Sequence, residues 1–367
     1  MRCSHLNRAL CIFREANMNT IPVYQGKLTV YLDQNILDMF VKFGLGEFGE
    51  MLAREYQVVY SDETLKEIKR SVGYESKFLD VLNLLGAFHL KVCLDENFQP
   101  TGKATITERD SYQSFNEYNS NEPVYESIYE SIMLNVQKVY GGLNEHTFED
   151  IKDSQNDAYD ELHNFILKNI EDLKPHFPDL AVQLEAQADD MKQKLSDALT
   201  ESARRASENV GDSIGWSGIK DLRQSLDIGP MQLNNIEPPN VIQQIWSLCL
   251  EKLPNEANIT LEQFFGIERN PIYPSVEFFK YQKVNSIYNM LNMLGYFPDS
   301  KVHKERRFTA AISDQSHASF ATFADMLLSR DKSFLKKVQA AYEFLGIDTN
   351  IFHVAENMHN KAFKSDS

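Results

Sequence analysis

Short apolar runs alternate with helical stripes near both ends of the chain. Five runs rich in β-branched or aromatic residues have the length of strands, and they cover residues 27–32, 57–60, 88–94, 326–329 and 350–354. The segments between them carry apolar residues at spacings of three and four, which is typical of helices packed on a core. Strands that alternate with helices in this way indicate an α/β fold with a parallel sheet.

The middle of the chain has a different pattern, with helical stripes and no clear strand signal. The longest stripe steps by four and three from Leu184 to Ser202, which fits a helix packed in a bundle better than a short dimeric coiled coil. We therefore predict one α/β domain interrupted by a large all-helical insertion, as a surface loop can tolerate. The expected boundaries are an N-terminal extension 1–22, a first domain part 23–95, a helical insertion 96–300, a second domain part 301–355 and a C-terminal tail 356–367.

Composition narrows the class of protein. The 367 residues are 43% hydrophobic and 25% charged, which is ordinary for a globular protein. The formal net charge of −16 argues against indiscriminate binding to nucleic acid or to anionic membranes. The four cysteines show no CxxC spacing, and no apolar run reaches the roughly 20 residues of a membrane span. We expect a cytoplasmic protein with reduced thiols and no membrane association.

The charge is distributed unevenly along the chain. Residues 95–174 contain 17 acidic and six basic residues, whereas residues 301–337 contain eight basic and four acidic residues. The second segment is therefore basic within an acidic protein. A local basic surface of this kind can bind phosphates without making the whole protein bind nucleic acid.

Four carboxylates lie where the predicted strands and helices meet. Asp33 and Asp331 each follow a strand, Glu67 lies on the helix after the second strand, and Asp314 begins the helix before the fourth. The carboxyl ends of parallel strands form the rim where such sheets bind ligands. Any one of these acids alone is most simply a helix cap or a surface residue. Together they predict a site for Mg²⁺ or Mn²⁺, which prefer oxygen ligands and can activate water for attack on a phosphodiester.

Three neighbouring assignments stay open at this point. Glu63 lies one turn before Glu67 and could take its role. Asp325 begins the strand whose other end carries Asp331, which favours a turn residue over a further metal ligand. His317 lies one turn after Asp314, and it is either a packed helix residue or a contact to the substrate.

The four segments that carry these acids, in this order, resemble the motifs of the PIN-domain ribonucleases. The first is a strand that ends in Asp-x-Asn, and the second is a helix with Thr-Leu-x-Glu. The third is a helix that begins with Asp and continues with small residues. The fourth is a strand that ends in Ser-x-Asp, where the family usually has Thr-x-Asp. The segments are YLDQN (31–35), SDETLKEI (61–68), DQSHASFA (314–321) and LLSRDKSF (327–334).

This resemblance implies a PIN-like sheet and an endonuclease that depends on Mg²⁺ or Mn²⁺ and acts most often on RNA. Its catalytic and metal-binding residues would be Asp33, Glu67, Asp314 and Asp331. Asn35 would orient Asp33 or the substrate. With the basic segment taken into account, the expected substrate-binding residues are Asn35, Arg306, Arg307, His317, Arg330 and Lys332.

Substrate and partners are less defined by the sequence. RNA is the expected partner, and single-stranded DNA stays open because recognition of the 2′-OH leaves no sequence signature. The helical insertion is a candidate surface for a homodimer or a regulatory protein, and a nuclease with such an insertion would fit a toxin or a phage-defence effector. The alternative is a catalytically inactive PIN-like protein that binds partners through its helical insertion.

Overall fold

The computed structural model describes residues 24–95, 99–209, 213–254, 258–270 and 274–355, without the side chains of residues 121–130 and 209. The N-terminal extension expected at 1–22 and the C-terminal tail expected at 356–367 lie outside these residues.

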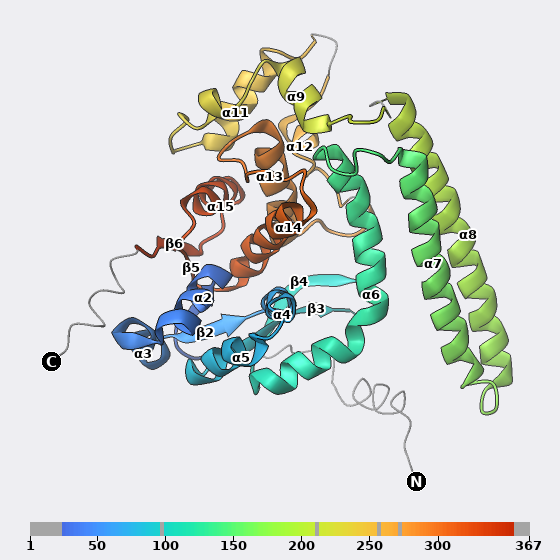
Figure 1. Cartoon of the computed structure of the whole chain (residues 1–367), viewed down its shortest axis with the longest axis horizontal. Helices are drawn as coiled ribbons and strands as arrows, with labels where there is room; N and C mark the ends of the chain where they lie inside the picture. Colours follow the sequence, from blue (N-terminus) through green and yellow to red (C-terminus); the bar gives the residue numbers. More distant parts are fainter. Residues whose placement is uncertain (1–23, 96–98, 210–212, 255–257, 271–273, 356–367) are drawn as a thin grey trace.

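A six-stranded sheet forms the centre of the molecule (Figure 1). Its strand order is β4-β3-β2-β1-β5-β6, and every neighbouring pair is parallel except the antiparallel pair of β3 and β4. All five apolar runs expected to be strands are confirmed. The strands are β1 (Thr29–Leu32), β2 (Gln57–Tyr60), β3 (Phe88–Leu94), β4 (Pro100–Glu108), β5 (Met326–Ser329) and β6 (Asn350–His353).

Helices cover both faces of the sheet. Because side chains alternate along a strand, Tyr31 packs into one apolar core while Val30 and Leu32 pack into another. The core of Val30 and Leu32 contains helices α2 (Gln34–Phe43), α3 (Gly46–Glu55), α4 (Asp62–Arg70) and α5 (Glu75–Leu84). The core of Tyr31 contains α9 (Gly218–Leu226), α10 (Pro230–Leu233), α11 (Val241–Leu250), α12 (Leu261–Phe264), α13 (Lys280–Leu294), α14 (Glu305–Phe320), the short 3₁₀ turn η1 (Ala321–Phe323) and α15 (Lys332–Leu345).

The segment expected to be an all-helical insertion contains a strand, so that prediction is wrong at this place. Strand β4 pairs with β3 over residues from Phe88 opposite Glu108 to Leu94 opposite Pro100. Strand β4 lies at the edge of the sheet and its side chains are half-buried or exposed. An edge strand of this kind needs few apolar residues, and its run of threonine, lysine and glycine therefore gave no strong strand signal.

The boundary expected at residue 300 does not separate two cores. Ile287, Tyr288 and Leu291 of α13 are fully buried in the same core as Tyr31 and Leu327 of the sheet. The apolar stripe of a helix has the same period whether the helix covers a sheet or packs in a separate bundle. Helix α13 is therefore part of the α/β core, although its sequence pattern could not distinguish the two.

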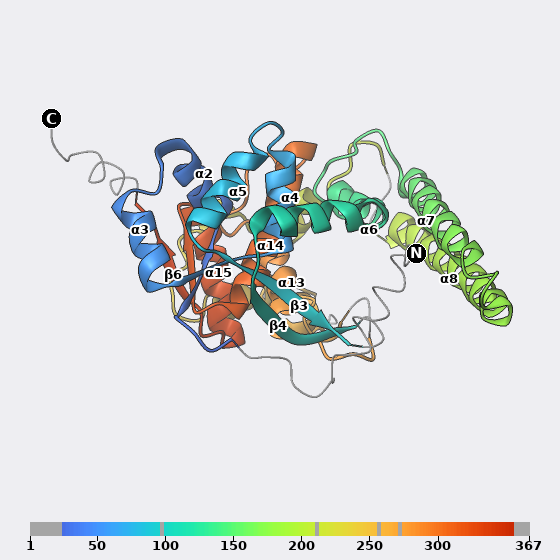
Figure 2. The same cartoon turned by 90° about the horizontal axis from the view of Figure 1, so that it is seen from below.

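Two long helices extend beyond the sheet layers. The long helix α6 (Ser111–Val139) leads to α7 (Phe148–Glu171) and α8 (Pro178–Asn209), which lie side by side and project from the rest of the molecule (Figures 1 and 2). An ion pair of 2.8 Å between Lys192 and Asp160 joins α7 to α8, and one of 2.7 Å joins Lys174, just after α7, to Glu185 of α8. The heptad-like stripe of α8 thus packs within one chain. Among the described helices, none combines the length and apolarity needed to cross a membrane.

Candidate acidic active site

Asp33 lies at the junction of the two central strands. It directly follows β1, is 4% exposed, and donates its backbone N–H to the carbonyl of Leu328 in β5 over 3.0 Å. Its Oδ2 accepts hydrogen bonds from the Ser329 hydroxyl and the Asn35 amide. Since β1 and β5 are parallel neighbours, their carboxyl ends bring Asp33 and Ser329 together.

Asn35 connects both strand ends. Its Nδ2 donates to Ser329 Oγ over 3.0 Å, and its Oδ1 accepts the backbone N–H of Arg330 over 2.9 Å. These bonds hold the Asn35 amide against Asp33. The geometry confirms that Asn35 orients Asp33, one of the two roles expected of it.

Asp331 acts as the cap of the helix that follows β5. Its Oδ1 accepts the backbone N–H groups of Ser333 at 2.7 Å and of Phe334 at 3.0 Å, at the start of α15. The residue is exposed, and its own N–H donates to Ser329 Oγ over 3.0 Å. One carboxylate oxygen is thereby used in capping, which is a common role for an aspartate at this position.

Glu67 is fixed by two neighbours on α14. Ser313 Oγ lies 2.8 Å from Glu67 Oε1, and His317 Nε2 lies 2.9 Å from Glu67 Oε2. Burial raises the pKa of Glu67, but the charge and hydrogen bond of His317 outweigh burial and leave it below the usual value. The same Ser313 hydroxyl lies 2.6 Å from Glu63 Oε1, so the two glutamates stand side by side.

His317 is a positioning residue for Glu67. Its side chain is fully buried, and its second ring nitrogen, Nδ1, lies 2.8 Å from the hydroxyl of Tyr31. Burial alone would lower the pKa of His317, but Tyr31 and Glu67 hold it well above its ordinary value. With both ring nitrogens occupied and no exposed surface, His317 cannot contact a substrate in this conformation. The expectation that it binds substrate is wrong, and the alternative of a packed, hydrogen-bonded helix residue is confirmed.

Asp314 lies on α14 within electrostatic reach of the strand ends. Burial is the largest cause that raises its pKa well above the ordinary value, and the charge of Asp33 adds to this effect. Burial likewise raises the pKa of Asp33 to about 6, against the opposing effects of His317 and Ser329, while the charges of Glu67 and Asp331 raise it further. The charges of Glu67 and Asp331 therefore act on Asp33, and those of Asp33 and Glu67 act on Asp314.

The four carboxylates are nevertheless not assembled as one metal-ligand set. Within the ranges that the structure describes, no group of three or more His, Cys, Asp or Glu side chains is placed to hold a metal ion. Both oxygens of Glu67 and one oxygen of Asp331 already accept hydrogen bonds. Asp33 likewise uses only Oδ2 in the hydrogen bonds described above, so one oxygen of Asp33 and one of Asp331 remain, together with Asp314, as donors to a cation. Mg²⁺ is commonly held by one or two carboxylates together with water. The residues present fit that binding mode, and the four-ligand metal site expected from the sequence stays a prediction.

An open cleft of about 490 Å³ lies beside these acids. It is lined by Gln34, Glu67, Arg70 and Arg306, from helices α2, α4 and α14. Gln34 lines the cleft, and its Oε1 atom is buried without a hydrogen-bond partner. The structure thus places Arg306 at the site, as the sequence predicts, together with Arg70 and the exposed acid Glu305.

The other expected basic residues lie elsewhere. Arg307 and Lys332 are exposed but do not line this cleft, and Lys332 lines a separate groove between α15 and β6. Arg330 contributes its backbone N–H to the bond with Asn35, and its side chain is half-buried.

Lys337 is the residue that the sequence interpretation missed. It was counted with the basic surface, but its side chain is fully buried, with Nζ 2.7 Å from Asp299 Oδ1 and 2.8 Å from Asn292 Oδ1. Desolvation lowers the pKa of Lys337, and its charge lowers the pKa of Asp314. The available signal was its position on the apolar stripe of α15, one turn from both Phe334 and Ala341.

Asp325 has a structural role at the opposite end of β5. Its Oδ2 accepts the backbone N–H and the hydroxyl of Thr29, each over 2.7 Å. These bonds tie the start of β1 to the start of β5. They fit the expectation that Asp325 is a turn residue, and its exclusion from the metal site stays a prediction.

We expect Asp325→Ala to lower the free energy of unfolding by about 2 kcal/mol, because the buried N–H of Thr29 loses a charged acceptor. Urea unfolding measures this change. The shift of the melting temperature on adding Mn²⁺ should stay equal to that of the wild type. Loss of that shift in Asp325→Ala would show that this residue takes part in metal binding after all.

The chain matches no family model, no curated protein and no solved structure in three comparisons with known proteins. The resemblance to PIN-domain ribonucleases therefore rests on the four sequence motifs.

Proposed function

We propose that this protein is an endoribonuclease dependent on Mg²⁺ or Mn²⁺, with its active site at the rim that carries Asp33 and Asp314. One observation carries the proposal: the buried carboxylate of Asp33 and the half-buried carboxylate of Asp314, both with raised pKa values, lie near a cleft whose lining includes Arg70 and Arg306. Buried like charges are unfavourable by themselves. A hard divalent cation would remove that repulsion, and the arginines would attract the phosphates of a nucleic acid.

Each residue has a defined role in this proposal. Asp33 and Asp314 hold the metal, while Asn35 and Ser329 keep the Asp33 carboxylate in one orientation. The bound metal supplies an activated water and stabilises the charge that develops on the phosphodiester. Arg306 binds a phosphate of the substrate in the cleft.

RNA is the proposed substrate because the motif set resembles ribonucleases. A second candidate is a non-catalytic protein that binds partners through its helices. Two observations favour this alternative. The described residues contain no group of three metal ligands, and the helices α7 and α8 project from the rest of the molecule (Figure 1). The two candidates differ in one property that can be measured, metal-dependent cleavage.

The deciding experiment incubates tRNA, mRNA and single-stranded DNA with the protein and Mn²⁺, and repeats the incubation in EDTA. We expect RNA cleavage with Mn²⁺ only, and a reduction of about tenfold or more in Asp331→Asn, which removes a charge beside the metal site. Asp348→Asn, at an exposed acid in the connection between α15 and β6, is the matched control and should cut normally. Equal cleavage in EDTA contradicts the metal-dependent mechanism, and no cleavage of any substrate favours the binding protein.

A further inference from the structure

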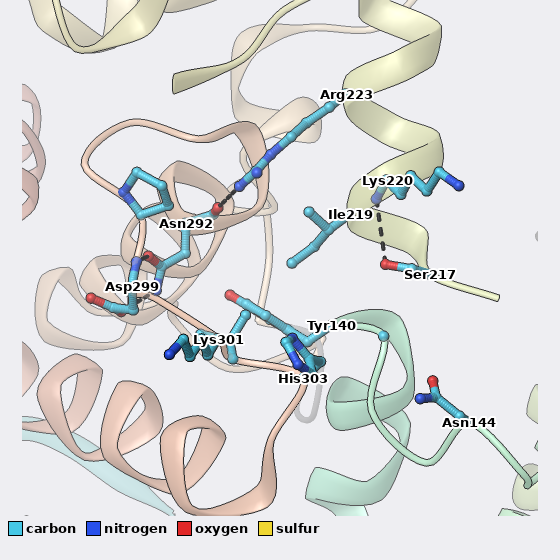
Figure 3. A pocket seen from close by; sticks show the side chains of 13 residues that line it. Tyr140, Asn144, Ser217, Ile219, Lys220, Arg223, Asn292, Asp299, Lys301 and His303 are labelled. Atoms are coloured by element: carbon cyan, nitrogen blue, oxygen red, sulfur yellow. Dashed lines mark hydrogen bonds between the residues drawn. The ribbon is translucent and has the colours of Figure 1, made fainter. Parts of the chain in front are cut away.

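A second cavity, of about 640 Å³, lies next to the start of α14 (Figure 3). Its walls come from the α6–α7 connection, from α9 and from the α13–α14 connection. Cavities of this size accommodate ligands as large as a nucleotide. The lining residues used below are Tyr140, Ile219, Arg223, Asp299, Lys301 and His303.

The cavity is positively charged. Arg223 points its guanidinium toward the end of α13, where Nε and Nη2 donate to the carbonyls of Met293 and Asn292, each over 2.8 Å. Lys301 and His303 are exposed at its opposite wall. Asp299 is the one acidic lining residue, and its charge is paired with that of buried Lys337. An anionic ligand therefore meets cations on two sides.

The floor of the cavity consists of apolar side chains that are held in place by their packing. Tyr140 and Ile219 pack with Phe308 of α14 in a small separate core, with Val302 against it. The Tyr140 hydroxyl is already bonded to Asn289, so its ring is fixed in place. An apolar surface beside cations suits a nucleobase next to its phosphate, because bases stack on apolar and aromatic side chains.

One short basic segment borders both cavities. Lys301 and His303 line the second cavity, and Arg306 lines the cleft beside Glu67. The segment 301–307 contains four basic residues and one acidic residue in a chain with a net charge of −16. Basic residues therefore stand at intervals along the start of α14 between the cleft and the second cavity, with Glu305 as the one acid among them.

We propose that the second cavity is a nucleotide-binding subsite, which holds a distal nucleotide of the same single strand that is cut at the acidic rim. The inference rests on the proposed function and specifies its substrate as single-stranded and several nucleotides long. The phosphates follow residues 301–307, and one base enters the cavity. A duplex cannot bind in this way, because its bases are stacked and paired.

The test measures RNA binding in EDTA, so that no cleavage is needed. Fluorescence anisotropy compares a labelled single-stranded RNA of about 12 nucleotides with one of about three. Lys301→Asn removes a cation, and asparagine tolerates the positive φ of 58° at this position. Asn144→Trp narrows the cavity, which exposed Asn144 lines, without changing its charge. Lys194→Asn on α8, 75% exposed, is the matched charge control.

We expect both cavity variants to weaken binding of the long RNA about fivefold and to leave binding of the short RNA unaffected. Lys194→Asn should bind like the wild type. The inference is overturned if Lys301→Asn weakens binding of the long and the short RNA equally, or if Asn144→Trp leaves binding of the long RNA unchanged. It is also overturned if AMP binds in the cavity while neither variant changes the binding of the long RNA. Length-dependent binding without cleavage in Mn²⁺ would leave this subsite standing and refute the nuclease activity.

Discussion

Asp33→Asn is expected to abolish the Mn²⁺-induced rise in melting temperature and to slow RNA cleavage by about a thousandfold. Asparagine keeps the size of the side chain and can still accept a hydrogen bond from Ser329, so the strand ends should stay in place. The negative charge at the centre of the rim is lost, and with it the principal ligand for a cation. Thermal unfolding with and without Mn²⁺, together with single-turnover cleavage, measures both effects.

The metal-free Asp33→Asn variant should be at least as stable as the metal-free wild type at pH 7. The pKa of Asp33 is raised from 3.8 to about 6, so its ionised form at neutral pH opposes folding, and removing the charge relieves this cost. A merely misfolded variant would show the opposite change. Asp38→Asn, a half-buried acid on α2 paired with Lys42, is the matched control and should leave metal binding and cleavage unchanged. A Mn²⁺ shift of wild-type size in Asp33→Asn contradicts the assignment.

Lys337→Met is expected to lower the free energy of unfolding by about 3 kcal/mol, the largest stability effect that we predict. Methionine fills the space of the buried lysine stem, but Asp299, with 16% of its side chain exposed, loses the cation at 2.7 Å. Asn292 also loses a donor at 2.8 Å. Denaturant unfolding at pH 7 measures the change.

The double variant Lys337→Met with Asp299→Asn separates charge from packing. Because it removes both members of the buried pair, we expect it to recover at least half of the stability lost in Lys337→Met. If the stability lost in the double variant equals the sum of the losses in Lys337→Met and Asp299→Asn, the pair is not coupled. The cost of Lys337→Met then comes from packing alone.

The sequence predicted the parts of the fold in which local pattern and burial agree. The runs that became β1, β2 and β5 are buried over most of their length, and Asp33 and Asp331 both reach Ser329 because neighbouring parallel strands end together. The exposed edge strand β6 was still predicted from its short apolar run, whereas β4 was missed because its run of threonine, lysine and glycine contains few apolar residues. Helix α13 was expected in the insertion because an apolar stripe shows that one face of a helix is buried, but not which element that face packs against.

The sequence predicted which residues lie near the site but not the hydrogen bonds between them. Sequence spacing could bring Glu67 and His317 near the rim, but it could not show that they bind each other and so remove Glu67 from the free oxygen donors. Lys337 was assigned to the surface because its charge was given more weight than its place on the stripe of α15. Side-chain partners across the fold depend on tertiary contacts, which a single sequence does not record.

The most direct test of the central claim is to locate the metal. Crystals of the wild-type protein soaked in MnCl₂ should give an anomalous difference peak between the carboxylates of Asp33 and Asp314, and Asp33→Asn crystals should lack it. A structure at full Mn²⁺ exposure with no peak at these two carboxylates would contradict the account of this rim as a metal-dependent nuclease site.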